Sequence, residues 1–75
     1  ASARNPLMAV YVDAAIHTWR NRLWCHLIAD DEDELHEFAR QLGLKRESFQ
    51  TQSSLDHYDI TKELREVAIE MGAVQ

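Results

Sequence analysis

A segment of this 75-residue chain recurs, without gaps, 29 residues further along. Residues Glu34 to Leu44 align with residues Glu63 to Ala73, and each copy carries an apolar helical pattern followed by a glycine. The same offset aligns Asp30 with Asp59. A repeat of this period indicates that one structural unit occurs twice. The alternative is coincidence, because a helix, a glycine and a strand often follow one another.

The first unit is predicted to be a strand, a helix and a glycine stop. The run from Trp24 to Ala29 is almost continuously apolar, as in a buried strand. From Asp31 to Leu42, apolar residues recur at the i, i+3, i+4, i+7 spacing of a helix that buries one face. Gly43 is suited to the left-handed conformation that commonly ends a helix. Residues Met8 to Val12 are rich in β-branched and aromatic side chains and predict an additional strand.

Two such units give the order β-α-β-β-α-β, the split arrangement of a ferredoxin-like sheet. We therefore expect a small two-layer α/β (α+β) sandwich with an extra N-terminal strand, formed by residues 8–75 as one domain. The first strands of the two units are expected to be central and parallel, which would bring Asp30 and Asp59 to the same edge. Residues 14–21 fit neither period, and residues 47–54 are expected to form a flexible loop. Residues 1–7 carry no pattern and are expected to lie outside the fold, with Met8 as its natural start.

Composition limits the classes of function. A net charge of -5 argues against a protein held to nucleic acid mainly by counterion release. A domain of this size buries only about 60 to 65% of its surface, so a deep pocket is not expected and a homodimer is plausible. Cys25 is the single cysteine, and no apolar stretch approaches the roughly 20 residues of a membrane span. These features favour a cytosolic protein without disulfides.

Alternation of side chains along the strands predicts a polar site. It puts His26 on one face of the strand from Trp24 to Ala29, while Cys25 and its apolar neighbours are expected to face the helices. His57 and Asp59 share a face, and the repeat brings that face to the side of His26. Two histidines and two aspartates are therefore predicted to converge, as ligands or as acid/base groups: His26, Asp30, His57 and Asp59.

Imidazole and carboxylate groups are ligands suited to Zn²⁺, Mn²⁺ or Fe²⁺. A metal here would polarise a phosphate or activate water, and without a metal a histidine beside an aspartate is an acid/base pair. Asp13 would join the metal ligands if its strand were parallel and adjacent to the other two. Arg22 is predicted as an anion clamp, and Tyr58 as a further ligand contact. No metalloprotease, paired-cysteine or phosphate-loop motif is present, so the spacing is not diagnostic.

Helix capping is the main alternative for the aspartates. Asp30, or Asp31 with Glu34 three residues later, would cap the first helix, and Asp59 or Thr61 would cap the second. The remaining histidines and aromatic residues have structural interpretations. His36 is expected at the boundary of the first helix, His17 has no expected role, and the following are core or interface candidates, with base stacking as the alternative: Tyr11, Trp19, Trp24 and Tyr58.

Several blocks of the sequence resemble a family of short bacterial and phage proteins known as domain of unknown function number 4031. The resemblance extends from Met8 to the end, and its most specific blocks are Cys25-His26 to Asp30 and His57-Tyr58-Asp59. It implies no activity. It does imply a set of motif positions, which favours a polar site: Tyr11, Asp13, Arg22, His26, Asp30, His36, His57 and Asp59. Family members often continue past the alanine-valine with a further short strand, so the last strand of this chain, which stops at Gln75, is expected to be truncated or to end early.

The leading hypothesis is therefore a small protein whose His/Asp site binds a divalent metal or a phosphorylated ligand. If the protein is catalytic, metal-assisted hydrolysis of a phosphoester is the expected reaction. The competing hypothesis is a non-catalytic, homodimeric interaction module in which the aspartates are caps and the aromatic residues form the interface.

Overall fold

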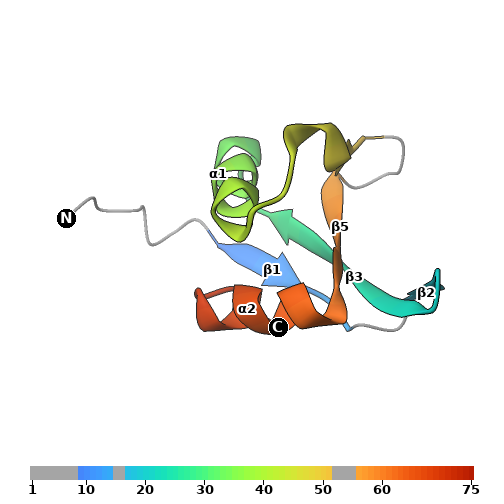
Figure 1. Cartoon of the computed structure of the whole chain (residues 1–75). Helices are drawn as coiled ribbons and strands as arrows, with labels where there is room; N and C mark the ends of the chain where they lie inside the picture. Colours follow the sequence, from blue (N-terminus) through green and yellow to red (C-terminus); the bar gives the residue numbers. More distant parts are fainter. Residues whose placement is uncertain (1–8, 15–16, 52–55) are drawn as a thin grey trace.

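The computed structural model describes residues 9–14, 17–51 and 56–75, which form a five-stranded sheet with two α-helices (Figure 1). No helix in this part of the chain is long and apolar enough to cross a membrane. The elements in chain order are β1 (Val10–Val12), β2 (His17–Trp19), β3 (Arg22–Ala29), α1 (Glu32–Leu42), the 3₁₀ turn η1 (Arg46–Ser48), β4 (Phe49–Gln50), β5 (His57–Thr61) and α2 (Lys62–Glu70).

Both helices pack on one face of the sheet. The buried hydrophobic residues of β1, β3 and β5 occupy alternate positions, so they belong to a single face, and they meet the apolar stripe of each helix. Cys25 lies in this core as predicted, and burial raises the pKa of its thiol to about 11. The core residues are Val10, Val12, Cys25, Leu27, Leu35, Phe38, Ala39, Tyr58, Ile60, Ala68 and Ala73. This arrangement confirms the small two-layer α+β sandwich.

The strand order is β1-β3-β5-β4, with β2 also paired to β3. Because β5 is antiparallel to both β3 and β4, β3 and β4 are parallel to each other. The connection through α1 therefore joins two parallel strands, and β5 lies between them. This is the split arrangement predicted from the repeat, formed here by the first unit, whereas β1 rather than the last strand of the second unit lies on the other side of β3. At the other edge, β1 pairs with β3, and Val74 forms only a single bridge, to Tyr11.

The expectation that the two central strands run parallel was wrong, because β3 and β5 are antiparallel. The two units are therefore related by a half-turn rather than by a shift along the sheet. Asp30 follows the end of β3, whereas Asp59 lies inside β5, directly opposite His26. Equivalent positions in the repeat are thus separated, and the two aspartates do not meet at one edge.

The helix caps are Asp31, one residue after Asp30, and Thr61, two residues after Asp59. The Asp31 side chain accepts a hydrogen bond from the backbone amide of Glu34 at 3.0 Å, and Thr61 Oγ1 accepts one from the amide of Leu64 at 3.2 Å. Gly43 ends α1 with φ of 90°, the left-handed conformation predicted for it. Neither Asp30 nor Asp59 caps a helix, so capping does not explain them.

Replacement of Asp31 tests this assignment. We expect Asp31→Ala to lower the free energy of unfolding by about 1 kcal/mol, because the first turn of α1 loses its side-chain acceptor. Asp31→Asn keeps an equally good cap and should be close to wild type. Urea unfolding followed by circular dichroism measures both, and an equal loss in the two variants would contradict the capping role.

A candidate metal centre on the open face of the sheet

The face of the sheet opposite the helices carries most of the predicted site residues. Residues paired directly across antiparallel strands have side chains on the same face. His26 pairs with Asp59, and His17 pairs with Trp24, which shares a face with His26 by alternation along β3. The prediction that Trp24 and His26 lie away from the helices fits this register.

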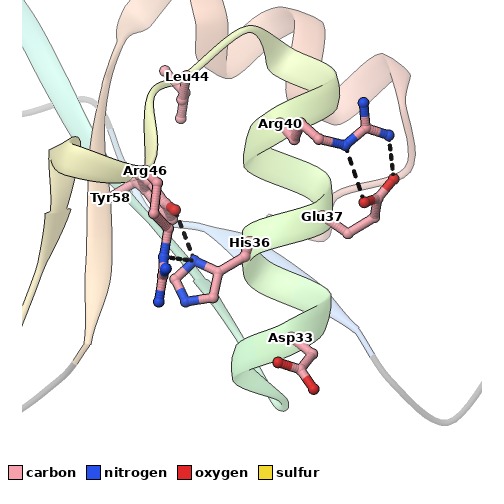
Figure 2. A pocket seen from close by; sticks show the side chains of 7 residues that line it. All are labelled: Asp33, His36, Glu37, Arg40, Leu44, Arg46 and Tyr58. Carbon is pink, nitrogen blue, oxygen red and sulfur yellow. Dashed lines mark hydrogen bonds and ion pairs between the residues drawn. The ribbon is translucent and has the colours of Figure 1, made fainter.

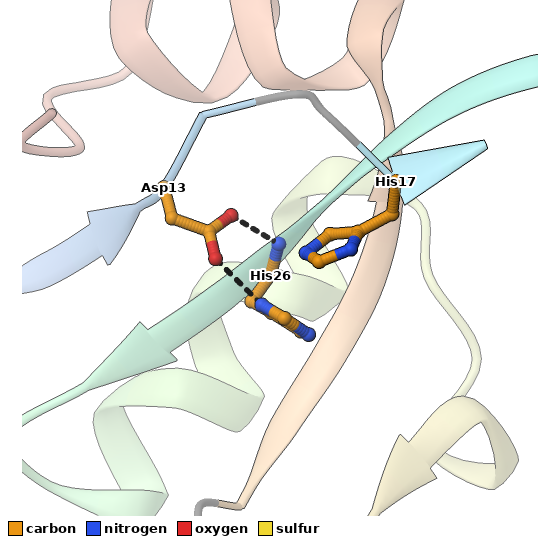
Figure 3. Close-up of side chains that lie close together, drawn as sticks. All are labelled: Asp13, His17 and His26. Atoms are coloured by element: carbon orange, nitrogen blue, oxygen red, sulfur yellow. Dashed lines mark hydrogen bonds and ion pairs between the residues drawn. The ribbon is translucent and has the colours of Figure 1, made fainter.

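Asp13 fixes the position of His26 through two contacts (Figure 3). Asp13 Oδ1 accepts a hydrogen bond from the backbone amide of His26 at 2.7 Å, and Oδ2 lies 2.5 Å from its ring Nδ1. With Nδ1 engaged by Asp13, the ring presents Nε2 to other partners. Asp13 was expected to join the metal ligands only if its strand ran parallel and adjacent to the other two. In fact β1 is adjacent and antiparallel, and the residue after its end lies beside the middle of β3.

The contacts of Asp13 favour its ionised form. Burial acts to raise the pKa of its carboxyl, but the hydrogen bonds from the backbone and ring of His26 and the charges of His26 and His17 outweigh it. The net result is a pKa below the ordinary value of 3.8. Asp13 is therefore an ionised, oriented acceptor for the His26 ring at neutral pH.

His57 and Asp59 approach His26 from β5. His57 Nε2 lies 3.3 Å from Asp59 Oδ1, and the rings of His57 and His26 have centroids 4.6 Å apart. His57 is only 9% exposed, so this pair is shielded from water on the His57 side. The structure thus brings three of the four predicted residues together, namely His26, His57 and Asp59.

His17 also lies beside His26, although no role was predicted for it. Its ring centroid lies 4.8 Å from that of His26. Two groups result, Asp13/His17/His26 and His26/His57/Asp59, and within each group one ligand atom per residue lies within 4.8 Å of the others. His26 belongs to both groups. We call these five residues the His/Asp cluster.

Three other predicted site residues lie outside the His/Asp cluster. Asp30 accepts hydrogen bonds from the Tyr11 hydroxyl at 3.1 Å and from the Ala9 amide at 3.2 Å, and the bond to Asp30 raises the pKa of Tyr11. Arg22 lies at the start of β3, exposed and paired with Trp19. Tyr58 is 1% exposed and faces the helices. Asp30 in particular was predicted as a ligand and instead ties β1 to the end of β3.

Tyr58 belongs to a second polar cluster, around His36 (Figure 2). His36 Nδ1 lies 2.7 Å from the Tyr58 hydroxyl and 3.1 Å from Arg46 Nε. Since the arginine nitrogen only donates, Nδ1 accepts both bonds and Nε2 carries the proton, which it donates to Glu32 at 3.1 Å. Burial raises the pKa of Tyr58. This cluster satisfies a buried hydroxyl and explains His36 and Tyr58 structurally.

A cavity of about 290 Å³ lies beside the second cluster. Its rim carries both charge signs, because Arg40 is held by Glu37 through bonds of 2.7 and 3.1 Å to the two carboxylate oxygens. Arg46 lies 3.8 Å from Glu32, so both rim arginines are already paired with carboxylates. The His/Asp cluster, with three imidazoles in reach of two carboxylates, is the stronger functional candidate.

The pKa of Asp13 generates a pH-dependent prediction for the metal-free protein. This pKa is lower in the folded than in the unfolded chain, so the ionised carboxylate stabilises the fold. The stabilisation is complete above about pH 3.8 and is lost as the pH falls through the pKa of the folded state. We expect the free energy of unfolding of wild type to be about 1 kcal/mol higher than that of Asp13→Asn at pH 7. This is less than a fully buried charged hydrogen bond contributes, because the carboxylate is 45% exposed. Urea unfolding in chelator at pH 7, 5 and 3 measures this. A difference that stays constant down to pH 3 would contradict the assignment.

Comparison with known proteins gives one match. The family model described as protein of unknown function (DUF4031) matches residues 10–75. No curated protein and no solved structure matches the chain. The matched range includes every strand and helix of the sheet and the whole His/Asp cluster. The chain therefore belongs to the DUF4031 family of proteins of unknown function.

Proposed function

We propose that this protein binds a divalent transition metal on the open face of the sheet, through His17, His26, His57 and Asp59, with Asp13 orienting His26. The observation that carries the proposal is the shared position of His26 in two groups whose ligand atoms lie within 4.8 Å of one another. Three strands and the residue after a fourth contribute to this arrangement, so the fold itself preorganises it.

The spacing of His57 and Asp59 supports tetrahedral coordination. Ligand atoms about 2.0–2.1 Å from a tetrahedral metal are about 3.3 Å from one another. His57 Nε2 and Asp59 Oδ1 are 3.3 Å apart. The same two atoms can therefore bind one metal with little rearrangement, while the exposed side chain of His17 would turn toward them from its place beside His26.

The contact between Asp13 and His26 is the type of support that metal-binding histidines have. A ligating imidazole commonly donates its other ring N–H to a carboxylate, which fixes the tautomer and strengthens the ligand. Asp13 is held ionised by the same contact. His26 would then coordinate through Nε2, and the carboxylates of Asp13 and Asp59 would balance the charge of the cation.

Three imidazoles and one carboxylate suit Zn²⁺, with Mn²⁺ and Fe²⁺ as the related choices. Such a centre acts as a Lewis acid and lowers the pKa of bound water. Metal-assisted hydrolysis of a phosphoester is the reaction that we propose for it.

Zinc titration of chelator-treated protein tests the proposal. We expect one Zn²⁺ per chain by calorimetry, and a rise in unfolding free energy of about 2.7 kcal/mol when free zinc is 100 times its Kd. His17→Ala and Asp59→Asn change exposed residues, so the fold should persist while zinc affinity falls at least about 10-fold. Asp13→Asn should lose about 10–100-fold, as expected for a supporting carboxylate.

The matched control is Asp30→Asn, an exposed aspartate outside the cluster, which should bind zinc like wild type. A chain that binds less than one equivalent would overturn the proposal. Equal losses in Asp30→Asn and Asp59→Asn would do so as well, because zinc would then be bound by general surface charge.

A homodimeric interaction module is the second candidate function. It is favoured by the outer surface of α2, where Val67 and Met71 lie one turn apart and remain 43% and 38% exposed, and by Val74 at 46%. Apolar surface on a small domain is a common site of association.

Sedimentation velocity at increasing protein concentration tests the dimer. If α2 forms the interface, wild type should shift to the dimer and Val67→Lys should remain monomeric at the same concentrations. The substitution Glu66→Gln, also exposed on α2 and with the same change in net charge, serves as the control. A wild-type chain that stays monomeric throughout would rule this function out.

A further inference from the structure

We propose that the cavity beside the His/Asp cluster binds the aromatic ring of a nucleoside monophosphate, whose phosphate reaches the proposed metal. This inference rests on the metal site proposed above and names the ligand class of that site. It starts from the lining of the cavity, which consists of His17, Trp19, Trp24 and Asp59. Two of these are proposed metal ligands and two are indoles.

The cavity is small and mainly apolar at its indole end. Its volume is about 190 Å³, below the roughly 300–1,000 Å³ of pockets that enclose a drug-sized molecule. It can therefore hold one ring system while the rest of the ligand stays outside. Since His17 and Asp59 also line the cavity, a ring bound here lies next to the proposed metal.

The two indoles form a fixed aromatic corner. Trp24 Nε1 donates a hydrogen bond to the backbone carbonyl of Trp19 at 3.0 Å, and the two rings meet edge to face with centroids 5.7 Å apart. Trp19 nevertheless remains 58% exposed, which is unusual for a side chain with so much apolar surface. An ordered and exposed indole beside a cavity is a stacking surface for a planar ring.

The Arg20 guanidinium lies on the same corner. The Arg20 guanidinium carbon is 4.5 Å from the centroid of the Trp19 ring, and Arg22 pairs with Trp19 across the hairpin. Arg20 and Asn21 form the turn with φ of 51° and 61°, a left-handed conformation that is uncommon for arginine. In a chain of net charge -5, this local positive charge next to a metal site favours an anionic ligand.

An aromatic wall, arginines and a metal together match a ring that carries a phosphate. The ring alone would not use the metal or the arginines, and a sugar phosphate would leave the indoles exposed. The alternative occupant is a second copy of this chain, which would cover Trp19 without any ligand. The two can be separated because Trp19 and Trp24 are the only tryptophans of the chain and report directly on this corner.

The test uses the full chain loaded with one equivalent of Zn²⁺, which does not itself absorb or quench. Adenosine monophosphate, adenosine and ribose 5-phosphate are titrated separately, with tryptophan fluorescence excited at the red edge and calorimetry as readouts. We expect saturable quenching by adenosine monophosphate, at least about 10-fold weaker binding of the other two compounds, and a similar loss when zinc is removed. Trp19→Leu should bind the nucleotide about 10-fold more weakly or worse, whereas Trp19→Phe retains a stacking face and stays near wild type.

The outcomes separate this inference from the metal proposal. Zinc binding without nucleotide binding overturns the inference and leaves the metal site intact, whereas absence of zinc binding overturns both. Equal affinities for adenosine monophosphate and ribose 5-phosphate, or equal affinities of Trp19→Leu and Trp19→Phe, show that the indoles do not bind the ring. Emission that changes with protein concentration before any ligand is added assigns the corner to a second copy and also overturns the inference.

Discussion

The antiparallel pairing of β3 with β5 is the interaction on which the rest of the structure depends. On one face it aligns Cys25 with Ile60 and Leu27 with Tyr58, four of the most deeply buried residues of the core. On the other face it sets His26 opposite Asp59. A shift by one residue would exchange the two faces, because side chains alternate along a strand. The hydrophobic core therefore enforces the register that the polar cluster requires.

Much of the fold could be predicted from local sequence signals. The helix from Asp31 to Leu42 and its glycine stop follow from apolar spacing and from the φ that glycine tolerates, both of which act over a few residues. The repeat also indicated the split arrangement. The prediction that the central strands run parallel was wrong, because an internal repeat does not show whether its copies are related by translation or by rotation. Parallel and antiparallel pairing both place His57 beside Ile28, so the predicted face of His57 was correct. The predicted meeting of Asp30 with Asp59 depended on the parallel direction and was wrong.

The part of the site that sequence reasoning missed comes from non-local packing. His17 joins the His/Asp cluster because the turn at Arg20 and Asn21 folds β2 back on β3. Asn21 was recognised as a turn signal, and the alternation of His17 with Trp19 before it and of Trp24 with His26 after it could have indicated the hairpin. The bond between Tyr58 and His36 offered no such signal, since it joins a helix and a strand 22 residues apart and depends on how α1 lies over the sheet.

The bridge between Tyr11 and Val74 affects when the site can form. Val12 donates to the Val74 carbonyl and Val74 donates to the Val10 carbonyl, both at 2.8 Å, while Arg65 Nε donates to the Asp13 carbonyl at 2.7 Å. The carboxylate that orients His26 is thus anchored by contacts that span more than 50 residues. Contacts of such long sequence separation form late in folding, because the intervening chain must be ordered first. During synthesis Asp13 would therefore gain these contacts only after Arg65 and Val74 had left the ribosome, so the support of His26 would be completed after the ligands on β2, β3 and β5 had been made.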